Sequence, residues 1–276
     1  MLTLSTSSDM LQHILQAIRK LPSIPFSIPE WKAYIDKDDT AKWIEFKISL
    51  FPEAYRLQQC NALVMERVLP FAESIRHKLI RKYCSESAQD KIIGNESDQD
   101  CLIRPYLGKR RTAWGLSKLN VFSLRNFPFH IERIEELQLH SELYARIMAE
   151  TLAILYWTAQ VDANDVEFVL APPRPGTNAA AEISSDFLGP HVIWIIDFDC
   201  CRSMEMSPDG VTQAVAAFLK NDPFYPRPGK RDVRDLQNWT IFAEAFLTKS
   251  RELLEVENFS LADLWIERVE AEIGSR

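Results

Sequence analysis

The strongest constraint on the fold lies in the middle of the chain, where a long helical pattern leads into two strand-like segments. Residues 141–160 place a wide apolar stripe on one helix face, formed by Leu143, Ile147, Met148, Leu152, Leu155 and Tyr156. An acidic turn and a short strand follow over residues 161–170, and then a loop rich in proline and glycine over 171–190. The apolar run that begins at His191 leads into Asp197-Phe198-Asp199. This order predicts an α+β fold in which acidic residues lie beside both strands.

The rest of the chain predicts two unequal parts. The expected elements are a helix over 8–21 stopped by Pro22, a strand over 61–68, a helix over 71–83, a polar mobile loop over 85–100, a strand over 101–107 ended by Gly108, a short helix over 131–139 and helices after Pro208. Residues 22–29 contain three prolines and predict an extended linker. We therefore expect an N-terminal part over residues 1–107 and a mostly helical part over residues 108–276.

Composition and charge exclude several classes of protein. The chain has 276 residues, 46% of them apolar and 26% charged, which is typical of a globular protein. No apolar run approaches the roughly 20 residues of a membrane helix. The polar first nine residues show no secretory signal, so we expect a cytoplasmic protein without a membrane partner. The net charge of −7 argues against DNA binding. Five cysteines without a C-x-x-C pair predict neither a disulfide framework nor a metal site.

Positive charge is nevertheless concentrated in one stretch. Residues 101–131 contain no Asp or Glu, and they carry Arg104, Lys109, Arg110, Arg111, Lys118 and Arg125. A local patch of this kind can hold phosphate groups of RNA while the whole chain stays acidic. The plainer alternative is a solvated surface. As candidate phosphate-binding residues we take Lys109, Arg110, Arg111, Lys118 and Arg125.

The order of elements from the long helix onward resembles the C-terminal lobe of kinase-like phosphotransferases. There a catalytic Asp follows the helix, an Asn comes five residues later, and a metal-binding Asp closes the following strand. Those places fall on Asp162, Glu167 and Asp197. The resemblance implies a two-lobe architecture with a reduced N-terminal lobe and a mostly helical C-terminal lobe. Other kinase features are missing, because the first glycine is Gly94 and Lys47 is the only loose candidate for a phosphate-binding lysine.

Several longer strings carry a closer resemblance. They are residues 104–108 (RPYLG), 122–127 (FSLRNF), 148–150 (MAE), 161–170 (VDANDVEFVL), 197–201 (DFDCC) and 221–228 (NDPFYPRP). Together they resemble the fungal domain of unknown function 3669 family, sometimes labelled zinc-finger-like, from about residue 63 to residue 250. The family includes arginine-containing cyclodipeptide synthases. The resemblance therefore implies an enzyme that takes arginyl-tRNA and a second aminoacyl-tRNA and releases a cyclic dipeptide.

The acidic residues suit that chemistry. An aminoacyl ester is already activated, so the reaction needs no ATP and no other cofactor, but it needs a base and a pocket that holds both substrates. Carboxylates accept the planar guanidinium of arginine, and carboxylates packed together raise one another's pKa. We expect Asp162, Glu167 and Asp197 to be catalytic. The residues that we expect to bind substrate are Asp165, Asp199, Arg104 and Asn164.

Alternatives remain open for the site and for the function. Asp162 and Asp165 could simply cap a turn, and Arg104 could be a buried ion-pair partner. For the whole chain, one alternative is a small-molecule phosphotransferase that uses Mg²⁺-ATP on Asp162, Glu167 and Asp197. The other is a non-catalytic, pseudokinase-like interaction module.

Overall fold

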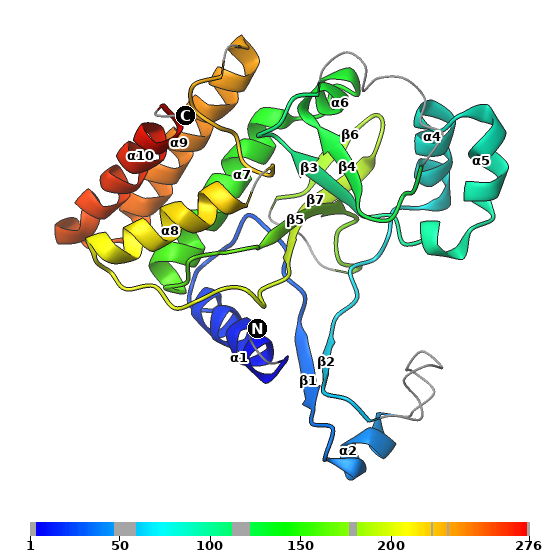
Figure 1. Ribbon diagram of the computed structural model, residues 1–276, viewed down its shortest axis with the longest axis horizontal. Coiled ribbons are helices and arrows are strands. Elements are labelled where there is room, and N and C mark those ends of the chain that lie inside the picture. Colours follow the sequence, from blue (N-terminus) through cyan, green and yellow to red (C-terminus); the bar gives the residue numbers. More distant parts are fainter. Residues whose placement is uncertain are drawn as a thin grey trace.

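The computed structural model describes residues 4–46, 59–111, 122–176, 181–221, 223–230 and 232–274, and it has an α+β architecture with two sheets (Figure 1). The helices are α1 (Leu4–Ile18), α2 (Thr40–Glu45), α4 (Glu73–Tyr83), α5 (Glu86–Ile93), α6 (Ile131–Glu136), α7 (Ser141–Ala153), α8 (Pro208–Lys220), α9 (Val233–Leu253) and α10 (Phe259–Gly274). None of these helices combines the length and the apolar character needed to cross a membrane. All five cysteines are free.

The larger sheet has five strands in the order β4-β3-β5-β7-β6. Their bounds are β3 (Ile103–Tyr106), β4 (Phe127–His130), β5 (Glu167–Ala171), β6 (Ile183–Ser185) and β7 (Gly189–Ile196). Strands β5 and β7 are antiparallel neighbours, and Glu167 at the start of β5 faces Ile196 at the end of β7. The loop that enters β5 and the loop that leaves β7 therefore lie at the same edge of the sheet, the one formed by the start of β5 and the end of β7. The acidic residues of the two loops were expected to lie there.

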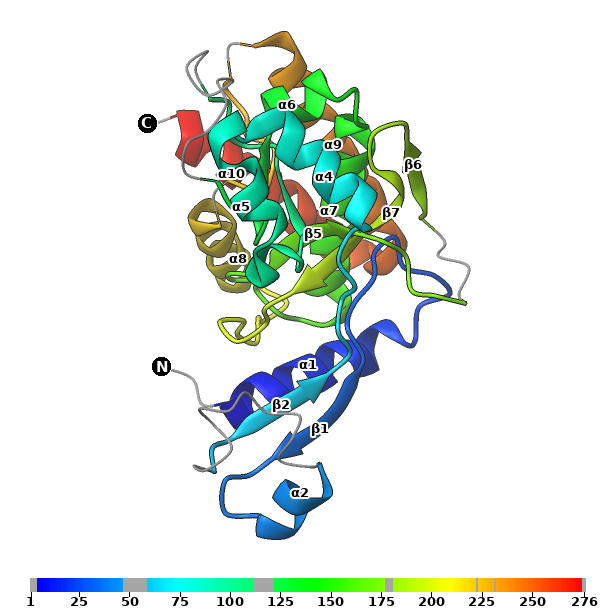
Figure 2. The same ribbon diagram turned by 90° about the vertical axis from the view of Figure 1, so that its right-hand side faces the viewer.

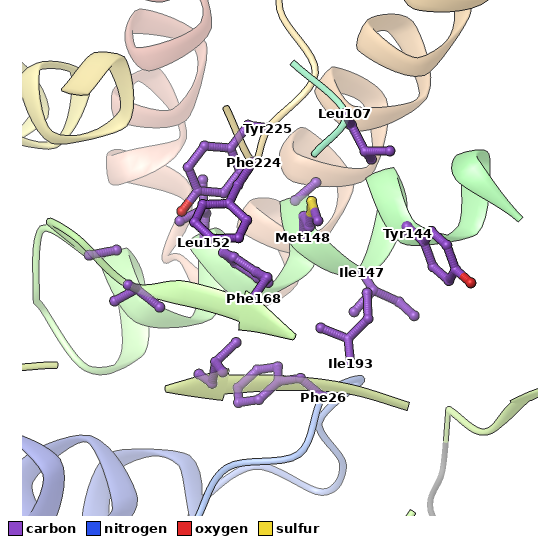
Figure 3. Packing of buried hydrophobic residues seen from close by; sticks show 14 of the residues in the cluster. Phe26, Leu107, Tyr144, Ile147, Met148, Leu152, Phe168, Ile193, Phe224 and Tyr225 are labelled. Atoms are coloured by element: carbon purple, nitrogen blue, oxygen red, sulfur yellow. The ribbon is translucent and has the colours of Figure 1, made fainter. Parts of the chain in front are cut away.

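Helix α7 packs against one face of this sheet. Figure 3 shows Ile147, Met148 and Leu152 of α7 directed toward Phe168 of β5 and Ile193 of β7, and all five side chains are buried. The expected helix over 141–160 is confirmed as far as Ala153, after which the chain widens into a π-helical turn over Ile154–Thr158. Helices α8, α9 and α10 complete the layer behind α7 (Figure 1). Burial of the apolar stripe of α7 thus fixes the helical layer to the sheet.

The described residues before α4 form an arm, and several contacts tie it to the body (Figure 2). Strands β1 (Trp31–Ile35) and β2 (Ala62–Met65) form an antiparallel pair with α2 at its far end. The linker before β1 joins the edge of β7, because Ser27 exchanges backbone hydrogen bonds with Ile193 and Ile195, 2.8 and 2.9 Å long. Arg174, which follows β5, donates a hydrogen bond to the carboxylate of Glu66 at 2.6 Å. Because Glu66 directly follows β2, this bond joins the end of β2 to the body.

Two sequence-based expectations about this fold were wrong, and one strand was missed. The predicted mobile loop over 85–100 contains α5 and a 3₁₀ turn at Glu96–Asp98, because Ala88 and Ile92 pack on the core and Asp98 is buried. The loop over 171–190 includes β6, which pairs with the start of β7. Strand β4 was not predicted, and it lies parallel to β3. Since β3 precedes residue 107 and β4 follows it, the larger sheet draws strands from both sides of the expected boundary.

The segment after β3 docks tightly on the chain that follows α8, and Gly108 permits this. The Leu107 and Gly108 amides donate to the carbonyls of Phe224 and Pro223, each at 2.9 Å. A Cβ atom on Gly108 would lie 2.3 Å from the Tyr225 carbonyl oxygen. That distance is far below van der Waals contact, so any side chain must push the two backbones apart.

We predict that Gly108→Ala lowers the free energy of unfolding by about 2 kcal/mol or more, because it forces the docked segments apart. Gly94→Ala is the matched control, since its added Cβ would meet only the Asp90 carbonyl at an ordinary 3.5 Å. Chemical denaturation of both variants measures the difference. Equal stability of the two variants would contradict this view of the docked segment.

Candidate functional site

Strained backbone marks the two loops that meet at the sheet edge. Among the described residues, six other than glycine have a positive φ angle. Four of them lie in these loops: Gln160 (53°), Ala163 (51°), Asp165 (64°) and Asp197 (66°). Such conformations cost free energy and persist where the surroundings impose them, often at functional sites. The strain therefore coincides with the acidic residues that the sequence singled out.

Four acidic residues form the carboxylate cluster of this site, namely Asp165, Glu167, Asp197 and Asp199. The pKa of Asp197 is raised to about 7, first by partial burial of its carboxyl, then by a hydrogen bond and repulsion from Asp199, and also by repulsion from Glu167 and Asp165. Burial likewise raises the pKa of Glu167, while the positive charge of Arg104 opposes the rise. The expected mutual effect of packed carboxylates on pKa is thus confirmed for this cluster.

Arg104 contacts the cluster from the neighbouring strand. It lies in β3 and forms an ion pair with Glu167 at the start of β5. Both side chains are largely shielded from solvent, 21% and 17% exposed. The Arg104 Nε is buried without a hydrogen-bond acceptor. The alternative of an ion-pair role for Arg104 is confirmed, and a substrate-binding role for it stays a prediction. The pair orients Glu167 while leaving the other three carboxylates without an arginine partner among the described residues.

Asp162 has a different setting from the carboxylate cluster. Its side chain is 3% exposed. One oxygen accepts hydrogen bonds from the amides of Asn164 (3.1 Å) and Arg202 (2.9 Å), and the other accepts from Gln213 Nε2 (2.9 Å). Asn164 in turn donates from its side chain to the Cys200 carbonyl at 3.1 Å. Asp162 and Asn164 therefore join the loop before β5 to the segment after β7, and catalytic or substrate-binding roles for them stay predictions.

Two cavities are each lined by one member of the carboxylate cluster. The large cavity has a volume of about 470 Å³, and Asp197 forms part of its wall together with residues of the arm and of the turn before β4. The small cavity, of about 210 Å³, is lined by Asn164, Asp165, Lys220 and Asn221. Asp197 and Asp165 affect each other electrostatically, so the two cavities open on one group of interacting charges. The two cavities are thus linked by interacting carboxylates.

The basic residues expected to bind RNA are placed less uniformly than the sequence suggested. Arg110 uses four of its five N–H donors on Glu135 and Asp235, at 2.7–3.3 Å. A phosphate could reach it only by displacing those carboxylates. Lys109, Arg111 and Arg125 are exposed, and Lys118 lies outside the described residues, as does Lys47. Arg125 lines the large cavity, on whose wall Asp197 also lies.

The ion pairs of Arg110 also explain a group of acidic residues that would otherwise suggest a metal site. In the described part of the chain, the single trio of potential ligands with atoms within 4.8 Å of one another is Glu135, Asp232 and Asp235. The Arg110 guanidinium already supplies the positive charge at this place, 2.8 Å from Glu135 and 2.7 Å from Asp235. The trio is therefore explained as an arginine-binding arrangement inside the protein.

Comparison with known proteins gives one match. Residues 193–258 match the model of the domain of unknown function 3669 family. That model is described as a zinc finger protein, and the match runs from β7 through the Asp197-Phe198-Asp199 segment, α8 and α9 to the 3₁₀ turn at Val256–Asn258. The matched residues contain two adjacent cysteines, Cys200 and Cys201, and no histidine, so they do not supply the ligands of a zinc finger. Neither the curated proteins nor the solved structures gave a match.

Several residues near the cluster could not be identified from the sequence. Glu66, Arg67 and Asp100 line the large cavity although they lie 97 or more residues before Asp197 in the chain. Asp98 is buried beneath the turn before β4. Nothing in the local sequence sets these residues apart from ordinary surface charges, because their position depends on how the arm and α4–α5 fold back on the sheet.

We predict that Asp162→Ala lowers the free energy of unfolding by about 2–4 kcal/mol, because it leaves buried amide donors without acceptors. Asp199→Ala serves as the control, since Asp199 is exposed and its removal relieves repulsion on Asp197. Chemical denaturation compares the two variants. Unchanged stability of Asp162→Ala would refute the anchoring role of this carboxylate.

The raised pKa of Asp197 predicts a pH-dependent stability. An acid whose pKa is higher in the folded state keeps its proton where the unfolded chain has lost it, so the unfolding free energy falls as pH rises from about 4 toward 7. Glu167 contributes in the same direction. Asp197→Asn should therefore flatten the dependence in this range, as measured by denaturation at a series of pH values. An identical slope in the wild type and the variant would contradict the assigned pKa.

Proposed function

We propose that this protein is an aminoacyl-tRNA-dependent synthase that joins arginine and a second amino acid into a cyclic dipeptide. The observation that carries the proposal is the Asp197 carboxyl, which has a pKa of about 7, lies in the carboxylate cluster and forms part of the wall of the large cavity. A general base works best when its pKa is close to the working pH, because it is then both available and strong enough to take a proton.

In the proposed reaction, Asp197 removes a proton from the α-ammonium group of one aminoacyl-tRNA. The amine attacks the ester carbonyl carbon of the other, an amide bond forms and the ester C–O bond breaks. The departing ribose oxygen takes up the proton from Asp197, and the second proton, which the attacking nitrogen loses as the amide forms, passes to the Asp197 carboxylate and from there to solvent. The free amine of the resulting dipeptidyl-tRNA then attacks the remaining ester in the same way. Two ester bonds break, two amide bonds form, and both tRNAs leave with a hydroxyl terminus.

Arginine recognition is supported by the charge and the position of the cluster. Asp165 and Asp199 are exposed carboxylates next to Asp197, and a guanidinium between them would replace repulsion with bidentate hydrogen bonds. The chain already pairs an arginine with a carboxylate in this manner at Arg110, whose two terminal nitrogens donate to the two oxygens of Glu135. The two cavities beside the cluster match the need for two substrates held in attack geometry.

We also infer a kinase-like ancestry for the lobe that contains the site. Its supports are the order of α7, the Asp162 loop, β5, β7 and Asp197, together with an arm that has two strands among the described residues. This order favours a Mg²⁺-ATP phosphotransferase as the second candidate function. The two candidates differ in a simple property, because the phosphotransferase must bind ATP and the synthase needs none.

The decisive assay incubates the protein with total tRNA, amino acids, ATP and aminoacyl-tRNA synthetases and searches by mass spectrometry for arginine-containing cyclic dipeptides. We expect a product that disappears with ribonuclease, and its mass will identify the second amino acid. Asp197→Asn should lower the rate at least about 100-fold, as expected for loss of a general base. In the wild type the rate should rise with pH through about 7, since the deprotonated form acts.

Arg251→Gln is a suitable control variant, because Arg251 is an exposed residue of α9 whose partner is Asp263 and not the cluster. It should retain the wild-type rate. Full activity of Asp197→Asn would exclude the proposed base. Absence of product from folded protein, with charged tRNA verified, would reject the synthase, and ATP binding in a thermal-shift assay would then favour the phosphotransferase.

A further inference from the structure

The large cavity has the size and lining of a small-molecule site. Its volume of about 470 Å³ is within the range of ligand pockets. Val68, Leu102 and Ile196 give it apolar walls, and these residues pack together on the outer face of β5 and β7. The wall combines segments of the arm, the stretch before β3, the turn before β4 and the end of β7. A ligand held here would contact the carboxylate cluster at one end.

Most charges on the cavity wall are already paired within the protein. Glu66 is held by Arg174, and Arg67 forms an ion pair with Asp100. Two charged groups are left over, the Arg125 guanidinium and the Asp197 carboxyl. Among the described residues no carboxylate pairs with Arg125, which is exposed at the cavity. A ligand therefore meets one unpaired cation and one carboxyl in the same cavity.

A buried carboxylate fixes the turn that presents Arg125. Asp98 is 2% exposed and accepts hydrogen bonds from Asn95 Nδ2 (2.6 Å), Ser123 Oγ (2.7 Å) and the Leu124 amide (2.6 Å). Ser123 Oγ in turn accepts from the Arg125 amide at 3.1 Å. The next residue, Asn126, has a positive φ angle of 53° and also lines the cavity. These hydrogen bonds hold the turn in one conformation, so the backbone of Arg125 has a fixed position at the wall of the cavity.

We infer that the large cavity binds the 3′-terminal aminoacyl nucleotide of arginyl-tRNA, with Arg125 contacting its phosphate and Asp197 facing the aminoacyl group. The inference rests on the synthase proposed above and names the subsite of one substrate. A phosphodiester carries one negative charge, which a guanidinium binds bidentately. The aminoacyl end is cationic, which suits the carboxyl. A nucleoside triphosphate fits less well, because among the described residues Arg125 is the one cation of this wall without a carboxylate partner, and it would face several negative charges beside the Asp197 carboxyl.

The test uses two stable probes, 3′-arginylamino-3′-deoxyadenosine with and without a 5′-phosphate, titrated into the full chain by calorimetry. The wild type should bind the phosphorylated probe about tenfold more tightly or better, the effect of a charged hydrogen bond. Arg125→Gln should abolish this preference and leave binding of the unphosphorylated probe unchanged. Arg81→Gln is the matched control, because Arg81 is an exposed arginine on α4 outside the cavity, and it should keep the preference.

The outcomes separate this subsite from the synthase itself. If cyclic dipeptide forms but Arg125→Gln keeps the phosphate preference, the subsite assignment is wrong and the proposed function stands. If the preference depends on Arg125 but charged tRNA gives no product, the nucleotide site stands and the synthase reaction fails. Tighter, Arg125-dependent binding of ATP than of the arginyl probe would overturn the inference in favour of the phosphotransferase.

Discussion

The antiparallel pairing of β5 with β7 determines most of what this molecule can do. Because Glu167 faces Ile196 across the two strands, the chain before β5 and the chain after β7 reach the same edge of the sheet. Phe168 and Ile193 are buried in the main core with α7, whereas Val169 and Trp194 belong to a second buried cluster, so a shift of register by one residue would exchange the side chains of the two clusters. The burial of Phe168 and Ile193 therefore fixes the position of acidic side chains that contribute nothing to the core.

Placing these acidic residues close together is unfavourable in free energy, and the rest of the fold compensates for it. Asp197 and Glu167 have raised pKa values, so the cluster disfavours its own charged state. Asp162, buried nearby, is satisfied by two backbone amides and Gln213, and it joins the two loops. The protein thus separates two kinds of carboxylate a few residues apart in the chain. Asp162 has its hydrogen bonds satisfied, and Glu167 is paired with Arg104. Asp165, Asp197 and Asp199, in contrast, are exposed and have no arginine partner among the described residues, which is the condition for binding a cation or moving a proton.

Sequence patterns predicted the parts of this arrangement that depend on local order. The apolar stripe of α7 and the run before Asp197 indicated a buried helix and a buried strand, and the acidic residues beside them indicated the cluster. The patterns failed where distant segments meet. Arg110 lies in a stretch without acids, yet Glu135 and Asp235 reach it from α6 and α9. Asp98 lies in a polar stretch typical of a loop, and only the folded chain brings Ser123 and Leu124 onto it.

The origin of the cavity wall has a consequence for how such proteins diversify. Pro29, Val68, Leu102 and Asn126 line the large cavity from four separate segments, and the carboxylate cluster comes from two others. Substitutions in the first group alter the shape that a ligand meets without disturbing the register of β5 and β7. Under the proposed function, selectivity and chemistry would be encoded in different stretches of the gene, so that copies of it could drift toward new ligands while they keep the Asp197 carboxyl in place.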